Sequence, residues 1–92
     1  MVKKDQQLID SSEIFKALGH PSRLCIVNKL SSGELNVTQM QECLGSSQSS
    51  ISQHLAILKS RGIIEGNRKG SEVIYSLVDE RMKAIVKVFL GD

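Results

Sequence analysis

The chain has 92 residues, which is the size of a single domain. Charged residues make up 24% and hydrophobic residues 40%, close to the globular norm, so disorder is excluded as the default state. No apolar run approaches the roughly 20 residues that cross a bilayer, and the polar N-terminus lacks a signal segment, so we expect a cytoplasmic protein. Aromatic residues make up only 3%, which favours aliphatic helix packing completed by a second copy of the chain.

The net charge of +2 is concentrated in one part of the sequence. Residues 46–71 carry four basic side chains against the single acidic Glu65. The four are Lys59, Arg61, Arg68 and Lys69. Residues 1–45 are neutral overall and residues 72–92 carry one net negative charge. A basic segment can attract a polyanion such as nucleic acid, although it is more often a solvated surface.

The N-terminal third predicts two helices. We expect residues 1–10 to be partly disordered, and the first helix to begin at 10–13 with a Ser or Asp cap and to end at Gly19. If the helix starts earlier, Leu8 joins its apolar face. Pro21 fits the first position of a second helix, where its missing N–H costs nothing. Ser31, Ser32 and Gly33 then stop that helix.

Two more helices are predicted in the middle of the chain. Asn36 is a good cap for a short helix over 37–44, which Gly45 closes. Ser46 and Ser47 cap a fourth helix that runs to about Ser60. Tandem helices joined by tight Gly/Ser turns are therefore expected before residue 61.

The pattern then changes to that of a β-hairpin followed by a last helix. Two β-branched runs, 63–65 and 72–77, flank a Gly/Asn/Lys turn that carries Arg68 and Lys69. Asp79 and Glu80 open a final helix with an apolar stripe. The expected fold class is mainly α with a small β-hairpin, in the order α-α-α-α-β-β-α, which is a winged helix-turn-helix.

The fourth predicted helix has an unusual polar face. Ile51, Leu55 and Leu58 form its buried stripe on a 3.6-residue wheel. The other positions hold small hydroxyls and amides almost without charge: Gln48, Ser49, Ser50, Ser52, Gln53 and Ser60. Such a face suits the DNA major groove, where Gln can bond adenine and Ser can donate or accept. A low-complexity polar turn is the alternative, and the buried stripe argues against it.

Three segments of the sequence resemble the ArsR/SmtB family of bacterial repressors. They are Ala17-Leu18-Gly19-His20-Pro21-Ser22-Arg23-Leu24, Glu34-Leu35-Asn36-Val37-Thr38-Gln39, and Ser47-Gln48-Ser49-Ser50-Ile51-Ser52-Gln53-His54-Leu55 with Leu58. The resemblance extends from about Ser12 to Leu90. It implies a homodimer built on the first and last helices, which binds double-stranded operator DNA at an imperfect palindrome and represses transcription.

The resemblance also implies roles for individual residues. Family DNA contacts carried onto this sequence place Gln48, Ser49, Ser52 and Gln53 in the groove, with Arg68 and Lys69 on the wing. Further DNA-contact candidates are Thr38, His54, Lys59 and Arg61. The expected dimer interface comprises Leu8, Phe15, Met82, Ile85 and Phe89.

The sequence departs from the metal-sensing members of that family. Their Cys-Val-Cys element is replaced here by Asn36-Val37-Thr38, which offers no soft ligand. At the start of the last helix Asp79 is present, but Arg81 stands where a His ligand would be. We therefore expect no metal site and no cofactor. His20 and His54 lack a third ligand, so a zinc site built on them is not expected.

The two cysteines, Cys25 and Cys43, leave an alternative open. In a reducing compartment both are expected to be buried thiols that act as small apolar groups. The alternative is a thiol switch, for which the family's dithiol pattern gives no support at these positions. No catalytic motif is found, so an enzyme is not expected. A winged-helix module that docks a protein is a further rival, although the polar face offers no large anchor.

Overall fold

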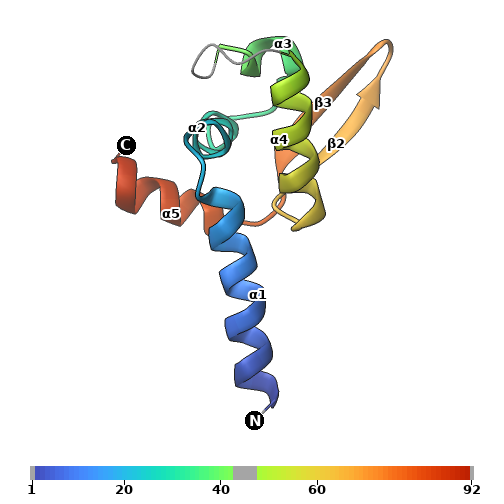
Figure 1. The fold of residues 1–92 in the computed structure, drawn as a ribbon. Coiled ribbons are helices and arrows are strands. Elements are labelled where there is room, and N and C mark those ends of the chain that lie inside the picture. The colour runs from blue at the N-terminus through green and yellow to red at the C-terminus, as the bar shows by residue number, and fades with distance from the viewer. Residues whose placement is uncertain (1, 43–47, 92) are drawn as a thin grey trace.

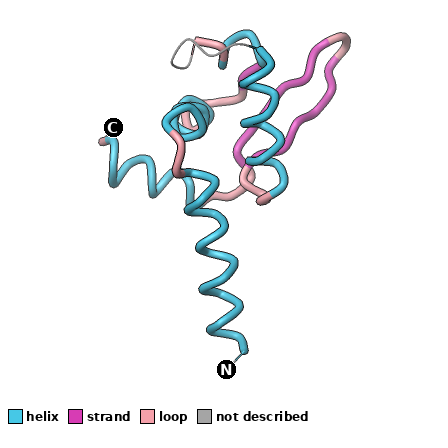
Figure 2. Tube along the Cα trace, viewed as in Figure 1, coloured by secondary structure: helices cyan, strands magenta, loops and turns pink. Residues whose placement is uncertain are grey.

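The computed structural model of the chain describes residues 2–42 and 48–91. The helix over residues 21–30 lies at the centre of the other helices, and a β-hairpin projects to one side (Figure 1; Figure 2). In chain order the elements are α1 (Val2–Leu18), α2 (Pro21–Leu30), β1 (Leu35–Asn36), α3 (Val37–Met40), α4 (Gln48–Ser60), β2 (Ile64–Lys69), β3 (Glu72–Leu77) and α5 (Arg81–Leu90). This is the expected winged helix-turn-helix order with one added short strand.

Helix α1 is longer than the sequence predicted. It begins at Val2 rather than at 10–13, so residues 2–10 belong to the helix. Side chains within the added turns stabilise the helix: Gln6 Nε2 donates to Asp10 Oδ1 at 2.9 Å, a spacing of four residues. Ser12, expected near the helix start, lies inside it and donates its hydroxyl to the Ile9 carbonyl at 2.7 Å. Residues 2–10 extend the helix because most of them, the Lys, Gln and Leu residues, are good helix formers.

The predicted start of α2 at Pro21 and the predicted Asn36 cap of α3 are both present, and a His20 cap that was not predicted precedes α2. The His20 side chain accepts a hydrogen bond from the Ser22 N–H at 3.1 Å, and Pro21 begins α2. Asn36 and Gln39 form a reciprocal capping box at the start of α3, with bonds of 2.8 and 2.9 Å. The predicted end of this helix and the predicted cap of the next fall on residues 43–47, outside the described part of the chain.

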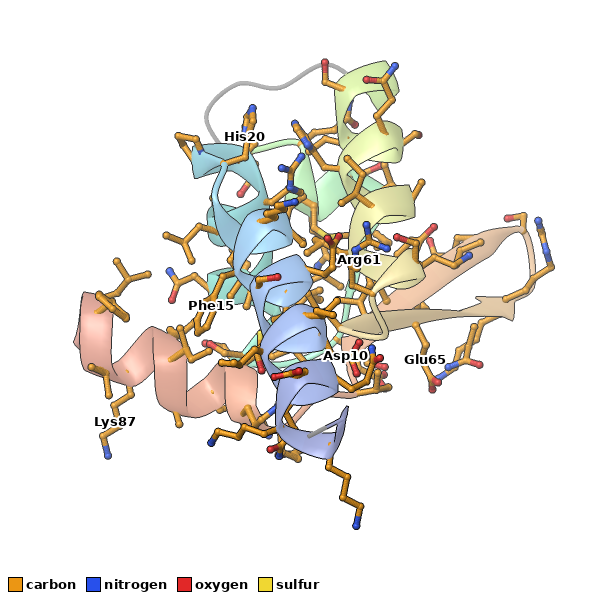
Figure 3. All side chains as sticks on the ribbon, turned by 60° about the horizontal axis from the view of Figure 1, so that its bottom comes forward. Asp10, Phe15, His20, Arg61, Glu65 and Lys87 are labelled. Carbon is orange, nitrogen blue, oxygen red and sulfur yellow. The ribbon has the colours of Figure 1, made fainter. Side chains whose placement is uncertain are left out.

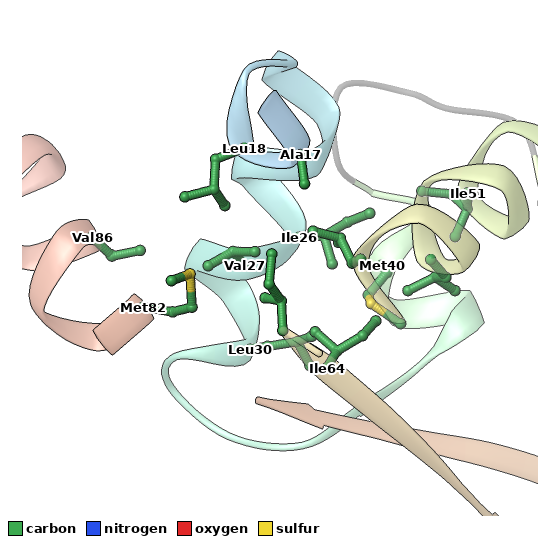
Figure 4. Close-up of a cluster of buried hydrophobic side chains, with 13 residues drawn as sticks. Ala17, Leu18, Ile26, Val27, Leu30, Met40, Ile51, Ile64, Met82 and Val86 are labelled. Atoms are coloured by element: carbon green, nitrogen blue, oxygen red, sulfur yellow. The ribbon is translucent and has the colours of Figure 1, made fainter. Parts of the chain in front are cut away.

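The core gathers around α2, which packs against α1, α4, α5 and β3. Helix α2 contributes Ile26, Val27 and Leu30, which are at most 3% exposed (Figure 4). The cluster consists of buried aliphatic residues from every helix and from the start of the hairpin: Ala17, Leu18, Ile26, Val27, Leu30, Met40, Ile51, Leu55, Leu58, Ile63, Ile64, Met82 and Val86. None of them is aromatic, as the composition predicted.

The sheet has three strands in the order β1-β3-β2, all antiparallel. Strands β2 and β3 form the predicted hairpin, and Gly70 turns it with a φ of +66°. Gly66 lies opposite Tyr75, where an added Cβ would lie 2.9 Å from the ring, so the ring covers the glycine. Strand β1 was not predicted, because two residues show no periodicity.

Candidate nucleic-acid interface

Helix α4 has the two faces that its sequence predicted. Ile51, Leu55 and Leu58 are at most 2% exposed and pack into the core. Ser52 and Gln53 are exposed on the outside of the helix. Gln48 and Ser49 form the first turn of α4, and their side chains lie outside what the structure describes. The described part of the helix therefore offers one hydroxyl and one amide to solvent near its N-terminal half.

Helix α3 packs against α4, as the two helices of a helix-turn-helix do. Thr38, in the first turn of α3, is exposed. The hairpin runs beside α4 and extends past it (Figure 1). The exposed face of α4 is thus flanked by α3 on one side and by the hairpin on the other.

The hairpin tip carries Arg68 and Lys69, both exposed as predicted. The strand register adds a detail that the sequence analysis missed: Lys69 lies opposite Glu72, whereas Arg68 lies opposite Val73. Residues directly opposite in an antiparallel pair point to the same face. The Lys69 charge is therefore partly offset by a carboxylate, and Arg68 is the less compensated cation of the tip.

The two basic residues near the end of α4 differ in their surroundings. Lys59 is exposed in the last turn. Arg61 donates to Glu13 of α1 at 2.8 Å, and its side chain points back toward α1 (Figure 3). Because this pair lies at the opposite end of α4 from Gln48, Arg61 is separated from the polar N-terminal face. The structure thus does not bring Arg61 together with the other predicted DNA contacts.

His54 is half-buried. It contacts His20, in the turn between α1 and α2, and Arg23, in the first turn of α2. Its Nδ1 lies 3.3 Å from Nη1 of Arg23, and its ring centroid lies 4.5 Å from that of His20. Burial lowers the pKa of His54, and the charges of His20 and Arg23 lower it further. Sequence reasoning missed Arg23, although a cation in the first turn of α2, where the helix dipole disfavours it, was an available signal.

Helices α1 and α5 expose large apolar side chains. Leu8 and Phe15 are each 61% exposed, and Phe89 is 76% exposed. Ile85 is half-buried between α1 and α5, where it lines a pocket with Phe15. Met82, also expected in the dimer interface, is 0% exposed in the protomer and packs into the core (Figure 4). The reason is that α5 turns the Met82 side of its stripe onto α2.

The acidic residue at the start of α5 is bound by an arginine. Arg81 donates to both oxygens of Asp79, from Nε at 2.9 Å and from Nη2 at 2.7 Å. These hydrogen bonds hold the pKa of Asp79 below its ordinary range. Across residues 2–42 and 48–91, no group of three His, Cys, Asp or Glu side chains is placed to hold a metal ion.

Cys25 departs from the expected buried thiol. It is half-buried in α2 and is disulfide-bonded, and the described residues hold no free cysteine. The other cysteine of the chain, Cys43, lies outside the described residues. In the part of the chain that the structure describes, no helix is long and apolar enough to span a membrane.

Comparison with known proteins identifies the family. Residues 20–65, which contain α2, α3 and α4, match the model of the bacterial regulatory proteins of the arsR family. The chain is 39% identical over 82 residues to the transcriptional repressor PagR of Bacillus anthracis, covering 88% of this chain and 82% of PagR. The chain belongs to the ArsR family of bacterial regulators.

Several solved structures share the fold of this chain. The crystal structure of PagR aligns with a TM-score of 0.79 at 38% identity, covering 90% of this chain and 95% of PagR. Reduced HlyU from Vibrio cholerae aligns with a TM-score of 0.85 at 28% identity, covering 96% and 93% of the two chains. The homodimeric winged helix-turn-helix domain of Mb0332 from Mycobacterium bovis aligns at 0.83 and 30% identity, covering 98% and 86%. This ArsR-family chain is thus a DNA-binding transcriptional regulator with a winged helix-turn-helix fold.

Proposed function

We propose that this protein is a repressor whose homodimer binds a twofold-symmetric operator, with α4 of each protomer in the major groove. The observation that carries the proposal is the exposed, uncharged polar face of α4 beside the basic hairpin tip. Ser52 and Gln53 supply base contacts. Arg68 and Lys69 supply contacts to phosphates or to the adjacent minor groove. The name of PagR as a repressor supports the direction of regulation.

Replacing Gln53 with alanine is expected to relax sequence preference at one base pair. The amide can bond a base edge in two places, and losing such a pair costs about 1–3 kcal/mol of discrimination. The operator is first obtained by selection from random DNA duplexes with the wild-type protein. Fluorescence anisotropy then measures Kd for that operator and for its single-base variants.

Ser60→Ala is the matched control for Gln53→Ala. Ser60 lies on the same face of α4 about two turns further along, and its hydroxyl donates within the helix to Ile57. This variant should keep the wild-type preference at every base pair. If Gln53→Ala also kept it, Gln53 would not read a base.

Removing both hairpin cations, by Arg68→Ala with Lys69→Ala, is expected to weaken binding to all DNA sequences alike. Each lost phosphate contact lowers the slope of log K against log salt by about one, so the slope falls by about two per protomer. Titrations at several salt concentrations measure the slope.

Lys3→Ala with Lys4→Ala is the control for the removal of two positive charges. These exposed residues lie at the N-terminal end of α1, far from the hairpin tip (Figure 1). Their removal should leave the salt slope within about 0.5 of the wild-type value, since contacts rather than net charge set it. An equal drop in both double variants would argue against phosphate contacts at the hairpin.

Three narrower proposals accompany the main one. The protein acts without a metal ion, because Arg81 already occupies both oxygens of Asp79 and Thr38 and Asn36 replace soft ligands. It is cytoplasmic, where DNA is accessible. It catalyses no reaction. Operator binding measured with zinc, cadmium and arsenite added is expected to match binding in chelator, and release of DNA by any of them would contradict the first proposal.

A second candidate function is a thiol-responsive repressor that uses Cys25 and Cys43. The disulfide at Cys25 supports it. Mild peroxide or persulfide, followed by alkylation and mass measurement without reductant, should give a monomer-mass species with no free thiol and a changed operator Kd. A Cys25→Ser variant should keep one Kd under both conditions. Two alkylated thiols with unchanged affinity would end this candidate.

A further inference from the structure

Arg23 joins three helices behind the exposed face of α4. Its Nε donates to the carbonyl oxygen of Ala17 at 2.5 Å, and its Nη1 lies 3.3 Å from Nδ1 of His54. Ala17 lies in the last turn of α1, and His54 lies in the middle of α4. Arg23, half-buried in the first turn of α2, therefore connects the helix expected to dimerise with the helix expected to read DNA.

A second contact, between α1 and the residue that follows α4, is weaker than the Arg23 contacts. Arg61, just after α4, pairs with Glu13 of α1 at 2.8 Å, but the two side chains are 42% and 36% exposed. Exposed ion pairs contribute little because water and salt screen them. The Arg23 cluster is half-buried, and one of its two bonds ends on a backbone carbonyl that cannot move independently of α1. It is the contact better placed to fix the two helices relative to each other.

We propose that Arg23 is a positioning residue for DNA binding, which sets the placement of α4 relative to α1 through His54 and the Ala17 carbonyl. In a dimer built on α1, this placement decides how far apart the two α4 helices lie. Their separation has to match one turn of DNA, about 34 Å. The inference rests on the proposed position of α4 in the major groove.

The hydrogen bond between Arg23 and His54 forms only when the His54 ring is neutral. An arginine side chain has donors and no acceptor, so Nδ1 of His54 has to accept, with its proton on Nε2. The titratable and charged groups that bear on His54 among the described residues are His20, before α2, and Arg23. Protonation of His54 removes the acceptor and places a second positive charge against the guanidinium. Operator affinity is thus retained while His54 is neutral and is lost as the pH falls through its pKa.

The pKa of His54 places this loss on the acid side of neutrality. Burial lowers it from the ordinary histidine value, and the electrostatic effects of His20 and Arg23 lower it further. A site contacting DNA phosphate through His54 would behave in the opposite way, because a protonated ring attracts phosphate. The sign of the pH dependence therefore separates a positioning role for His54 from direct contact.

The test measures operator specificity, the ratio of Kd for unrelated DNA to Kd for the selected operator, at about pH 7.5 and at a lower pH where NMR shows the His54 ring to be protonated. Wild-type specificity is expected to fall about tenfold at the lower pH, a typical size for coupling between two sites. His54→Gln keeps an acceptor oxygen and does not titrate, so its specificity should be the same at both pH values. His20→Asn keeps a capping oxygen and should retain the wild-type fall.

Arg23→Met is expected to have low specificity at both pH values while remaining a folded dimer by circular dichroism and sedimentation. If the wild-type protein kept or gained specificity at low pH, or if His54→Gln lost it as the wild type does, the proposal would be overturned. The comparison of wild type with His54→Gln decides this even if Arg23→Met does not fold. Failure to select any operator at neutral pH would instead overturn the proposed function.

Discussion

Replacing Phe89 with glutamate is expected to dissociate the dimer and weaken operator binding about 100-fold or more. Phe89 is 76% exposed in the protomer, next to Val88 and Leu90, so its ring needs a partner surface. A charge there opposes burial against a second copy. A monomer holds one half-site and loses the gain from binding two linked sites, about 10²–10⁴ in affinity. Analytical ultracentrifugation and anisotropy titration measure the two effects.

Lys87→Glu is the control for the Phe89 substitution. Lys87 lies on the same helix and is exposed on its charged side (Figure 3). The substitution changes the charge by two units, more than Phe89→Glu does, yet it should leave the dimer and the operator Kd close to wild type. A Phe89→Glu protein that stays dimeric and binds the operator would show that this part of α5 lies outside the interface.

Replacing Ile51 with alanine is expected to lower the free energy of unfolding by about 2–5 kcal/mol. Ile51 is 0% exposed and fixes the inner side of α4 against the core. A domain of this size is stabilised by about 5–15 kcal/mol in total, so the loss is a large fraction of it. Because Ile51 lies on the helix turn next to Ser52, operator affinity should fall with stability. Urea unfolding followed by circular dichroism measures the change.

Ile57→Ala makes the same chemical change on the same helix at an exposed position. Ile57 is 38% exposed, so truncation removes less buried surface and should cost about 1–2 kcal/mol. Both variants are compared at one protein concentration, since dimer dissociation makes apparent stability depend on concentration. Equal losses in the two variants would contradict the assignment of the buried face of α4.

Local patterns predicted the middle of the fold well. The start of α2 at Pro21, the Asn36 cap of α3, the buried stripe of α4 and the hairpin all follow from residues close together in the sequence. The start of α1 was wrong because Ser11 and Ser12 resemble a cap but lie within the helix. The burial of Met82 was not predicted, because the wheel gives a stripe without saying which part of it meets α2.

The candidate site was predicted in its exposed residues and missed in its supporting ones. Ser52 and Gln53 are exposed because helical periodicity places them opposite the core. His54 and Arg61, in contrast, have partners 31 and 48 residues away, Arg23 and Glu13, and no local pattern encodes such contacts. The charge offset between Lys69 and Glu72 depends on the strand register, which the turn sets.

Selection from a random pool of DNA duplexes with the purified dimer tests the central claim most directly. The account predicts enrichment of an inverted repeat whose half-site centres lie about one helical turn, or 10 base pairs, apart. Enrichment should disappear with Phe89→Glu and should broaden at one position in each half-site with Gln53→Ala. A pool that stays random, or that converges on a site without twofold symmetry, would contradict the assignment of this chain as a dimeric repressor that reads DNA with α4.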